Sequence, residues 1–224
     1  RGGSGTPVGR TGMTWSGFRP SDDACRYGYN IPAQFMAMRA LREVGEFTRV
    51  WEDVQLARRA AKLAEENEAG VTQYGIVDGH FAYEVDGFGS VLQMDDANMP
   101  SLLSLPLTSD LRADDPLHLA TRAWVLGDAN PYLYRGPAAC GVGSPHSPAG
   151  YVWHIGLAVQ GLTGDETEAR SCLETILATD GGTGWTHESF DPADPTWFTR
   201  PWFSWSNSMA CLLMMKVAGL DPLT

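Results

Sequence analysis

The sequence lacks long apolar runs and is short of positive charge. No stretch of about 18 apolar residues occurs in it, so no segment is expected to span a membrane, and residues 1–15 lack the apolar centre of a signal peptide. Lys and Arg number 16 against 27 Asp and Glu, which gives a formal net charge of −11. Because such a surface repels phosphate groups, nucleic-acid and membrane partners are disfavoured. We expect a soluble protein with a neutral ligand. The compartment stays open, and secretion or passage through the secretory pathway is compatible with the sequence.

Cysteine is scarce, and no group of residues has the spacing of a metal site. The four cysteines are widely separated, so they allow either buried thiols or two disulfide bonds but do not resemble zinc ligands. The five histidines show no ligand spacing either. We therefore expect no catalytic metal and no cofactor. These residues are Cys25, Cys140, Cys172, Cys211, His80, His118, His146, His154 and His187.

Two further kinds of catalytic motif are missing. No Gly-rich phosphate loop occurs along the chain. Ser144 and Ser189 each lie close to a histidine, but neither stands in a nucleophile-elbow sequence, which disfavours a Ser-His-Asp triad. Any catalytic chemistry is then expected to come from carboxylates.

Apolar residues recur at helical spacing along most of the chain. Ser21 is placed as an N-cap with Asp22 and Asp23 in the first turn, and a break at Gly45 divides the following apolar pattern into a helical hairpin. Further helices are expected at 101–105 (closed by Pro106), from Asp115–Pro116 to about Gly127, over 153–160 and 169–177, and from Trp205 onward.

The remaining segments predict turns and loops. Alternating residues on both sides of Asp78–Gly79 indicate a β-hairpin over about 73–85, and the breakers in 130–150 predict an irregular, functional loop. We expect an N-terminal loop at 1–12 and a single helical domain over 13–224. About seven helices in antiparallel-looking pairs are the pattern of an α/α toroid, so the fold class expected is mainly α.

The stretch 183–207 gathers aromatics around a few polar groups. Seven Trp and Phe residues surround His187, Glu188 and Arg200, and such a mixture suits the apolar face and hydroxyls of a sugar. Bulky neighbours would partly desolvate Glu188 and make it a usable proton acceptor. The alternative is a Glu that serves as a helix cap or a salt-bridge partner.

Three acidic clusters stand apart from solvated charge runs: Asp22–Asp23, Asp95–Asp96 and Glu188. Glycoside hydrolysis uses a pair of carboxyl groups, one protonated to donate to the leaving oxygen and one ionised. The alternative is that both Asp pairs are ordinary first-turn residues of helices. Spacing alone favours the first-turn interpretation, because acids are common in the first turns of helices.

Four blocks of sequence point further. They read WSGFRPSDDA from Trp15, MDDANMPSLL from Met94, GSPH from Gly143, and HESF from His187 followed by TRPW from Thr199. In order and content they resemble the signature blocks of glycoside hydrolase family 125. That resemblance implies an (α/α)6 barrel and a metal-independent, inverting exo-α-1,6-mannosidase that trims mannosides or N-glycans.

The resemblance also implies roles for individual residues. The general acid would be Asp22 or Asp23, a choice that the sequence leaves open, and the general base would be Glu188. The residues implied to bind the terminal mannose are Arg19, Asp95, Asp96, Asn98, His146, His187, Arg200 and Trp202.

Family members carry roughly as much sequence again ahead of the first block. The resemblance therefore implies that this chain holds about half of the barrel. Three alternatives stay open: the chain is a fragment, another chain supplies the missing N-terminal half as a partner, or this half folds differently. An alternative from another class is a non-catalytic, carbohydrate-binding fragment of such an enzyme.

Overall fold

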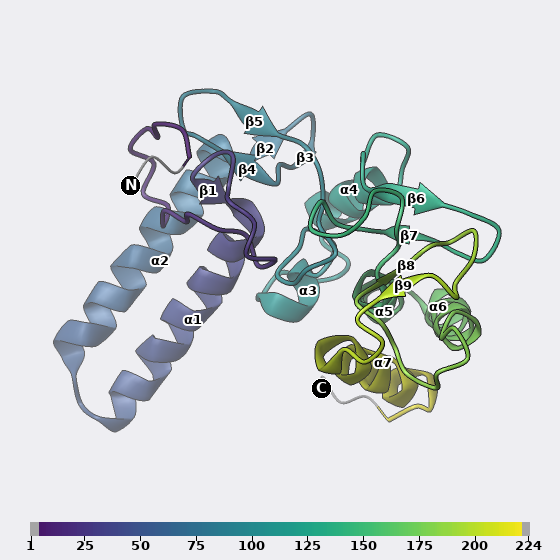
Figure 1. The fold of residues 1–224 in the computed structure, drawn as a ribbon. Helices are drawn as coiled ribbons and strands as arrows, with labels where there is room; N and C mark the ends of the chain where they lie inside the picture. The colour runs from purple at the N-terminus through teal and green to yellow at the C-terminus, as the bar shows by residue number, and fades with distance from the viewer. Residues whose placement is uncertain (1–4, 221–224) are drawn as a thin grey trace. The chain divides into compact units, whose positions relative to one another are not determined.

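The computed structural model describes residues 5–220, which are mainly helical with small antiparallel sheets. They divide into two compact units (Figure 1): the chain up to Met94 with Met99–Arg122, and Asp95–Asn98 with the chain from Ala123 onward. Residues 1–4 of the predicted N-terminal loop, and 221–224, lie outside the described range. The single domain expected over 13–224 stays a prediction.

The first unit contains an antiparallel helical hairpin, α1 (Ile31–Val50) and α2 (Val54–Tyr74). Asn30 caps α1 through Oδ1, which accepts from the Ala33 amide at 3.1 Å, and Asp53 caps α2 in the same way. The expected helix start at Ser21 is therefore wrong, because Asn30 supplies the cap. The expected break at Gly45 is also wrong, since an interior glycine costs a helix only about 1 kcal/mol.

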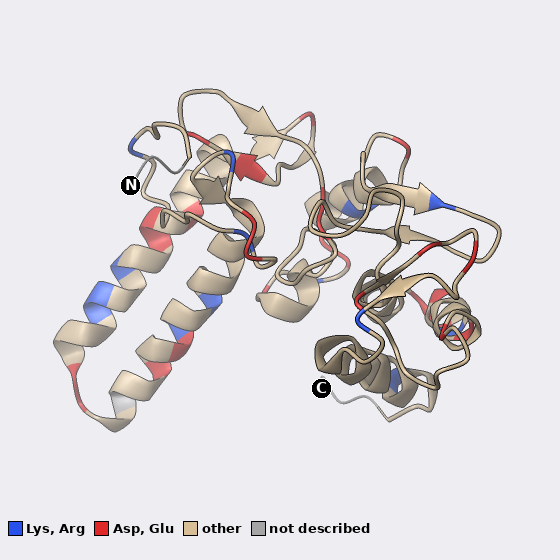
Figure 2. Ribbon diagram, viewed as in Figure 1, with Lys and Arg blue, Asp and Glu red and all other residues tan. Residues whose placement is uncertain are grey.

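Figure 2 shows that this hairpin carries charges of both signs. Arg39 pairs with Glu43 at 3.0 Å, and Arg42 pairs with Glu68 at 3.2 Å and with Asp110 at 2.7 Å. All of these side chains are exposed, so each pair contributes no more than about 1 kcal/mol. These ion pairs belong to a solvent-exposed surface and do not indicate a functional site.

Two small sheets follow the hairpin. β2 (Ile76–Val77) and β3 (His80–Phe81) pair across Asp78 and Gly79, whose φ angles of +52° and +82° suit a two-residue hairpin turn, so the predicted β-hairpin is confirmed. β1 (Tyr29–Asn30), β4 (Glu84–Val85) and β5 (Val91–Leu92) form an antiparallel sheet with β4 at its centre.

Two helices complete this region, α3 (Leu105–Thr108) and α4 (Pro116–Val125), the last residues of which belong to the second unit. The start predicted for α4 is confirmed, because Asp115 Oδ1 accepts from the amides of Leu117 and His118. The helix expected at 101–105 is wrong in position. Pro106 lies in the first turn of α3, where its missing amide costs nothing, so it opens the helix.

In the second unit α5 (His154–Thr163), α6 (Glu166–Ala178) and α7 (Ser204–Val217) pack together, as predicted from their periodicity (Figure 1). α5 is buried along nearly its whole length. Two hairpins accompany these helices: β6 (Leu133–Arg135) with β7 (Cys140–Val142), and β8 (Ser189–Phe190) with β9 (Phe198–Thr199). The β6–β7 hairpin corrects the expectation that 130–150 is irregular, since strands this short survive between turn residues.

All four cysteines are free thiols, with Cys25 and Cys172 buried and Cys140 and Cys211 exposed. Of the two arrangements that the sequence allows, the disulfides are thereby excluded. Across residues 5–220, no helix combines the length and apolar character needed to cross a bilayer.

Candidate active site

The segment 17–25 forms a tight loop that presents two carboxylates. The amide of Cys25 donates to the Gly17 carbonyl at 3.0 Å, and the amide of Arg19 donates to the Asp23 carbonyl at 2.8 Å. The Asp22 amide returns to the Arg19 carbonyl at 3.0 Å, with Asp22 in the left-handed region at φ +67°. Asp22 is exposed and Asp23 half-buried. Neither belongs to a helix, so the first-turn interpretation of this pair is wrong.

Arg19, in the same loop, is held by a buried carboxylate. Its Nε lies 2.6 Å from Oε1 of Glu84, with side-chain exposures of 10% for Arg19 and 0% for Glu84. The Arg19 guanidinium also lies over the Tyr83 ring, 5.7 Å from its centroid. Oε2 of Glu84 accepts from the amides of Arg26 and Tyr27 at 2.8 and 2.9 Å.

The block around Asp95 and Asp96 meets the block around Ser144 in the second unit. Asp96 Oδ1 accepts from the amide and side chain of Asn98 at 3.0 and 2.8 Å, and Asn98 Nδ2 reaches Ser144 Oγ at 3.3 Å. Ser144 Oγ also accepts from the His146 amide at 3.1 Å. Asp95 and Asp96 are completely buried, and no helix begins at either. The first-turn interpretation is therefore wrong here as well.

Glu188, which is only 7% exposed, is held at both carboxylate oxygens. Arg200 Nε lies 2.9 Å from Oε1, and Thr199 Oγ1 donates to Oε2 at 3.0 Å. The β8–β9 register brings Thr199 opposite Ser189, whose hydroxyl lies 2.7 Å from Thr199 Oγ1. Arg200 has a left-handed backbone at φ +46°, an uncommon conformation for a non-glycine residue. Glu188 is thus a buried, ion-paired carboxylate that immediately precedes strand β8.

His187 is fully buried beside Glu188. Its Nδ1 lies 3.0 Å from the Pro201 carbonyl and its Nε2 lies 2.9 Å from the Asp180 carbonyl. Its ring stacks on Phe198, with centroids 3.8 Å apart and planes 6° from parallel. These contacts hold the segment that carries Glu188.

A second buried histidine supports this segment. His154 Nδ1 accepts from the His187 amide at 2.9 Å, so its proton is on Nε2, which donates to Thr179 Oγ1 at 2.9 Å. Burial and, to a smaller extent, the neighbouring His187 lower the pKa of His154 to about 3. His154 is therefore neutral.

The aromatic stretch divides between core and surface. Phe190 is fully buried and stacks on His154 with centroids 4.5 Å apart, so this aromatic belongs to the core and not to a sugar-binding surface. Trp185, Trp197 and Trp202 are 52%, 66% and 57% exposed. Exposed indole faces are the surfaces on which sugar rings pack.

Comparison with known proteins now identifies the family. A profile described as metal-independent α-mannosidase, glycoside hydrolase family 125 (GH125), matches residues 1–215. The chain belongs to GH125.

GH125 relatives include the meiotically up-regulated gene 157 protein of Schizosaccharomyces pombe, which is 42% identical over 92% of this chain and 42% of its own length. A Streptococcus pneumoniae structure from a study of metal-independent α-mannosidases, a non-productive complex with α-1,6-mannobiose, is 41% identical with a TM-score of 0.93. The match covers 96% of this chain and 53% of that one. The chain thus spans about half the length of these relatives. A structure named a wild-type glycosidase shares the fold at a TM-score of 0.63 and 18% identity, covering 92% and 56%.

The residues expected from the GH125 resemblance fall in both units. Arg19, Asp22 and Asp23 belong to the first unit. The second unit holds Asp95, Asp96, Asn98, His146, His187, Glu188, Arg200 and Trp202. Within the second unit the structure joins the Asp95 block to the Ser144 block, and Glu188 to Arg200.

The sequence analysis did not identify Glu84 or Thr199. Glu84 could have been found, since it is the one acid in the apolar run Phe81–Val85, and a charge in a buried strand requires a partner. Thr199 could not, because hydroxyl residues are too common to single out.

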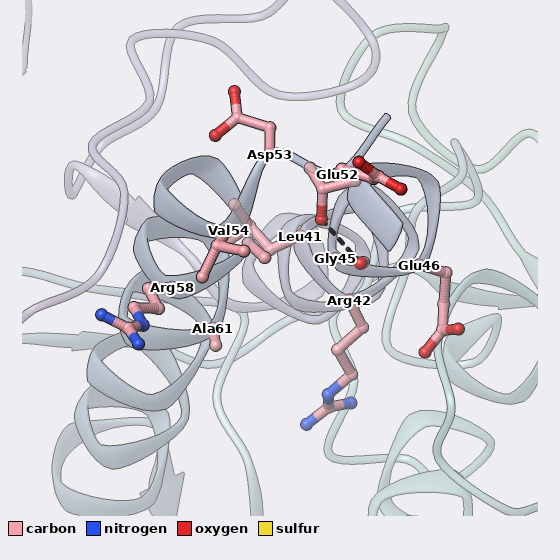
Figure 3. Close-up of a pocket in the computed structure, with 11 residues that line it drawn as sticks. Leu41, Arg42, Gly45, Glu46, Glu52, Asp53, Val54, Arg58 and Ala61 are labelled. Carbon is pink, nitrogen blue, oxygen red and sulfur yellow. Dashed lines mark hydrogen bonds between the residues drawn. The ribbon is translucent and has the colours of Figure 1, made fainter. Parts of the chain in front are cut away.

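A cavity of about 690 Å³ lies between the adjoining ends of α1 and α2 (Figure 3). Leu41, Val54 and Ala61 line it, and Thr48 Oγ1 donates to the Gly45 carbonyl at its edge. None of the residues expected at the active site lines this cavity, so it does not mark that site. Over residues 5–220, no three His, Cys, Asp or Glu side chains cluster as metal ligands would.

Proposed function

We propose that the full-length protein is an inverting, exo-acting α-mannosidase that removes terminal α-1,6-linked mannose from mannosides or N-glycans. The observation that carries this proposal is Glu188: a nearly buried carboxylate with both oxygens oriented, on a segment bearing exposed tryptophans, in a chain of the GH125 family. The relative solved with α-1,6-mannobiose supports the choice of linkage.

Glu188 is the general base in this mechanism. The Arg200 guanidinium and the Thr199 hydroxyl each bind one of its carboxylate oxygens and fix the direction of its free lone pairs. A water held by these lone pairs would attack the anomeric carbon from the face opposite the leaving group. The product would then have inverted configuration.

The general acid is Asp22 or Asp23, at the tip of the loop 17–25. An exposed tip allows the proton to be replenished from solvent after each turnover. In an inverting glycosidase the acid and base carboxyl groups are roughly 6.5–9.5 Å apart, which leaves room for one water. We propose this separation for the assembled active site.

The terminal mannose is held by polar groups from several loops. We assign mannose binding to residues of complementary chemistry. Guanidinium groups donate hydrogen bonds to the sugar hydroxyls, an imidazole donates or accepts them, and an indole face covers the sugar ring. Of the residues implied by the resemblance, Arg19, His146, Arg200 and Trp202 keep exposed surface and would contact the sugar. Asp95, Asp96, Asn98 and His187 are buried and would support the loops that carry these contacts.

We further propose that α1 to α7 belong to an (α/α)6 toroid. Such a barrel takes about twelve helices, and the matched relatives are about twice the length of this chain. A further portion of polypeptide, corresponding to the N-terminal half of the GH125 domain, would complete it.

The deciding experiment is incubation of the full-length protein with α-1,6-mannobiose while proton NMR follows the first sugar released. β-Mannose appearing first supports the proposal, whereas α-mannose first would mean retention and a different role for Glu188. Binding of mannobiose without turnover would instead favour the second candidate, a non-catalytic carbohydrate-binding protein, which the exposed tryptophans also suit.

A further inference from the structure

Glu84 concentrates three contacts on the loop that carries Asp22 and Asp23. Its Oε1 meets Arg19 Nε at 2.6 Å, and its Oε2 accepts from the amides of Arg26 and Tyr27. We propose that Glu84 is a positioning residue that holds this loop in its catalytic conformation. The inference rests on the proposed function, because it assumes that one of the two aspartates is the general acid.

The position of Glu84 in the fold makes it a rigid support. It lies on the central strand β4, opposite Asn30 on β1 and Leu92 on β5. Its side chain is completely buried, as are Tyr83 and Val85 on either side. A carboxylate in such surroundings requires donors at both oxygens, and the loop supplies them.

The contacts continue from Glu84 to the two aspartates through Arg19. The Arg19 side chain is bound by Glu84, its amide donates to the Asp23 carbonyl, and its carbonyl accepts from the Asp22 amide. Displacement of the Arg19 side chain is therefore transmitted to the backbone of both candidate acids. The amides of Arg26 and Tyr27 anchor the other end of the same loop.

Cys25 adds an independent sign that the loop is closely packed over Glu84. Burial and, to a smaller extent, the negative charge of Glu84 raise the pKa of the Cys25 thiol to about 12. Glu84 itself has no exposed surface, so it acts on a substrate only through the loop. These contacts make it a positioning residue and not a catalytic one.

The test compares two leaving groups in the full-length protein. Glu84→Gln keeps the size but removes the charge, which should loosen the loop and lower kcat on α-1,6-mannobiose by about 10- to 100-fold. The leaving group of 2,4-dinitrophenyl α-mannoside departs without a proton from the general acid, so kcat on this substrate should fall far less. Glu84→Asp keeps the charge and should recover part of the mannobiose rate; it also serves if Glu84→Gln does not fold.

The matched control is Asp86→Asn. Asp86 is a buried acid on the same β-hairpin, but its Oδ1 accepts from Phe88 and Ser90 and makes no contact with the loop. Its substitution should leave the ratio of the two rates unchanged. Equal losses on both substrates for Glu84→Gln, or the same change of ratio for Asp86→Asn, would overturn the inference.

A second measurement separates this inference from the proposed function. Hydrogen exchange at the amides of Arg26 and Tyr27 should be faster in Glu84→Gln than in Asp86→Asn. Only the first variant removes the charge and one of the two acceptor oxygens that bind Arg19 and these amides. Unchanged exchange would overturn the positioning role. Absence of wild-type turnover on either substrate would instead overturn the proposed function, with the exchange result still testing the support of the loop.

Discussion

Arg200 extends Nε to within 2.9 Å of Oε1 of Glu188 and does so from a left-handed backbone at φ +46°. An arginine in this conformation is held there by its surroundings, at a cost on the order of 1–3 kcal/mol. The sequence presents a proton-accepting Glu188 and a salt-bridged Glu188 as alternatives, but the two are compatible. Glu188 is both a salt-bridged residue and an oriented, nearly buried carboxylate suited to catalysis.

Removal of the proposed base should abolish most turnover without preventing binding. Glu188→Gln keeps the size of the side chain, so kcat on α-1,6-mannobiose should fall by about 10² to 10⁴ while the sugar still binds. Steady-state kinetics and calorimetric titration measure the two quantities. A variant that retains full kcat would show that another group activates the water.

The two candidate acids should respond differently to the leaving group. The Asn variant of the true acid should lose far more activity on mannobiose than on 2,4-dinitrophenyl α-mannoside, because only the first substrate needs a proton. Asp22→Asn and Asp23→Asn should be compared on both substrates. Two variants with identical ratios would contradict the assignment of the acid to this loop.

The hydroxyl of Thr199 should matter for rate more than for affinity. It donates to Glu188 Oε2 at 3.0 Å, and loss of a group that orients a catalytic residue typically costs about 10- to 100-fold. Thr199→Val should therefore lower kcat with little change in KM. Thr199→Ser retains the donor and serves as the control, so a Ser variant as slow as the Val variant would point to packing instead.

Acidification should destabilise the protein through its buried histidines. Burial lowers the pKa of His154 to about 3 and that of His118 to about 4. In the unfolded chain both have a pKa near about 6.5, so between these limits the unfolded state binds more protons. The free energy of unfolding should thus decrease as pH falls from about 6.5, by up to about 1.4 kcal/mol per pH unit for each group. Chemical denaturation at pH 7 and pH 5 checks this.

His118 provides a matched test of that slope. Neither of its ring nitrogens has a hydrogen-bond partner among the described residues, and its side chain is fully buried. His118→Leu should consequently be neutral or stabilising at pH 7 and more clearly stabilising at pH 5. If the gain is the same at both values, His118 does not contribute to the acid sensitivity.

Chelation should leave hydrolysis unchanged. We expect this from the absence of metal-ligand spacing in the sequence, and the description of the family as metal-independent agrees with it. Activity of the full-length protein should be measured before and after dialysis against EDTA. Loss of activity that calcium or zinc restores would contradict the expectation.

Much of the local structure could be predicted from sequence because its causes are local. Asp78–Gly79 dictates a hairpin turn through its φ angles, and Asp115–Pro116 starts a helix through a cap and a pre-set first residue. The errors arose where two local signals compete. Ser21 looks like an N-cap, but the buried Asn30, two residues before Pro32, caps the helix instead. Gly45 looks like a break, but α1 continues through it.

The sequence by itself determined the family, the predominance of helix and the candidate carboxylates, because blocks of adjacent residues carry that information. Only the tertiary structure decided which groups hold those carboxylates. Glu84 reaches Arg19 across 65 residues of sequence, and Thr199 reaches Glu188 across the β8–β9 hairpin. The physical reason is that burial leaves a charged group dependent on whatever donor the fold brings within about 3 Å. Local periodicity does not encode which distant residue that donor is.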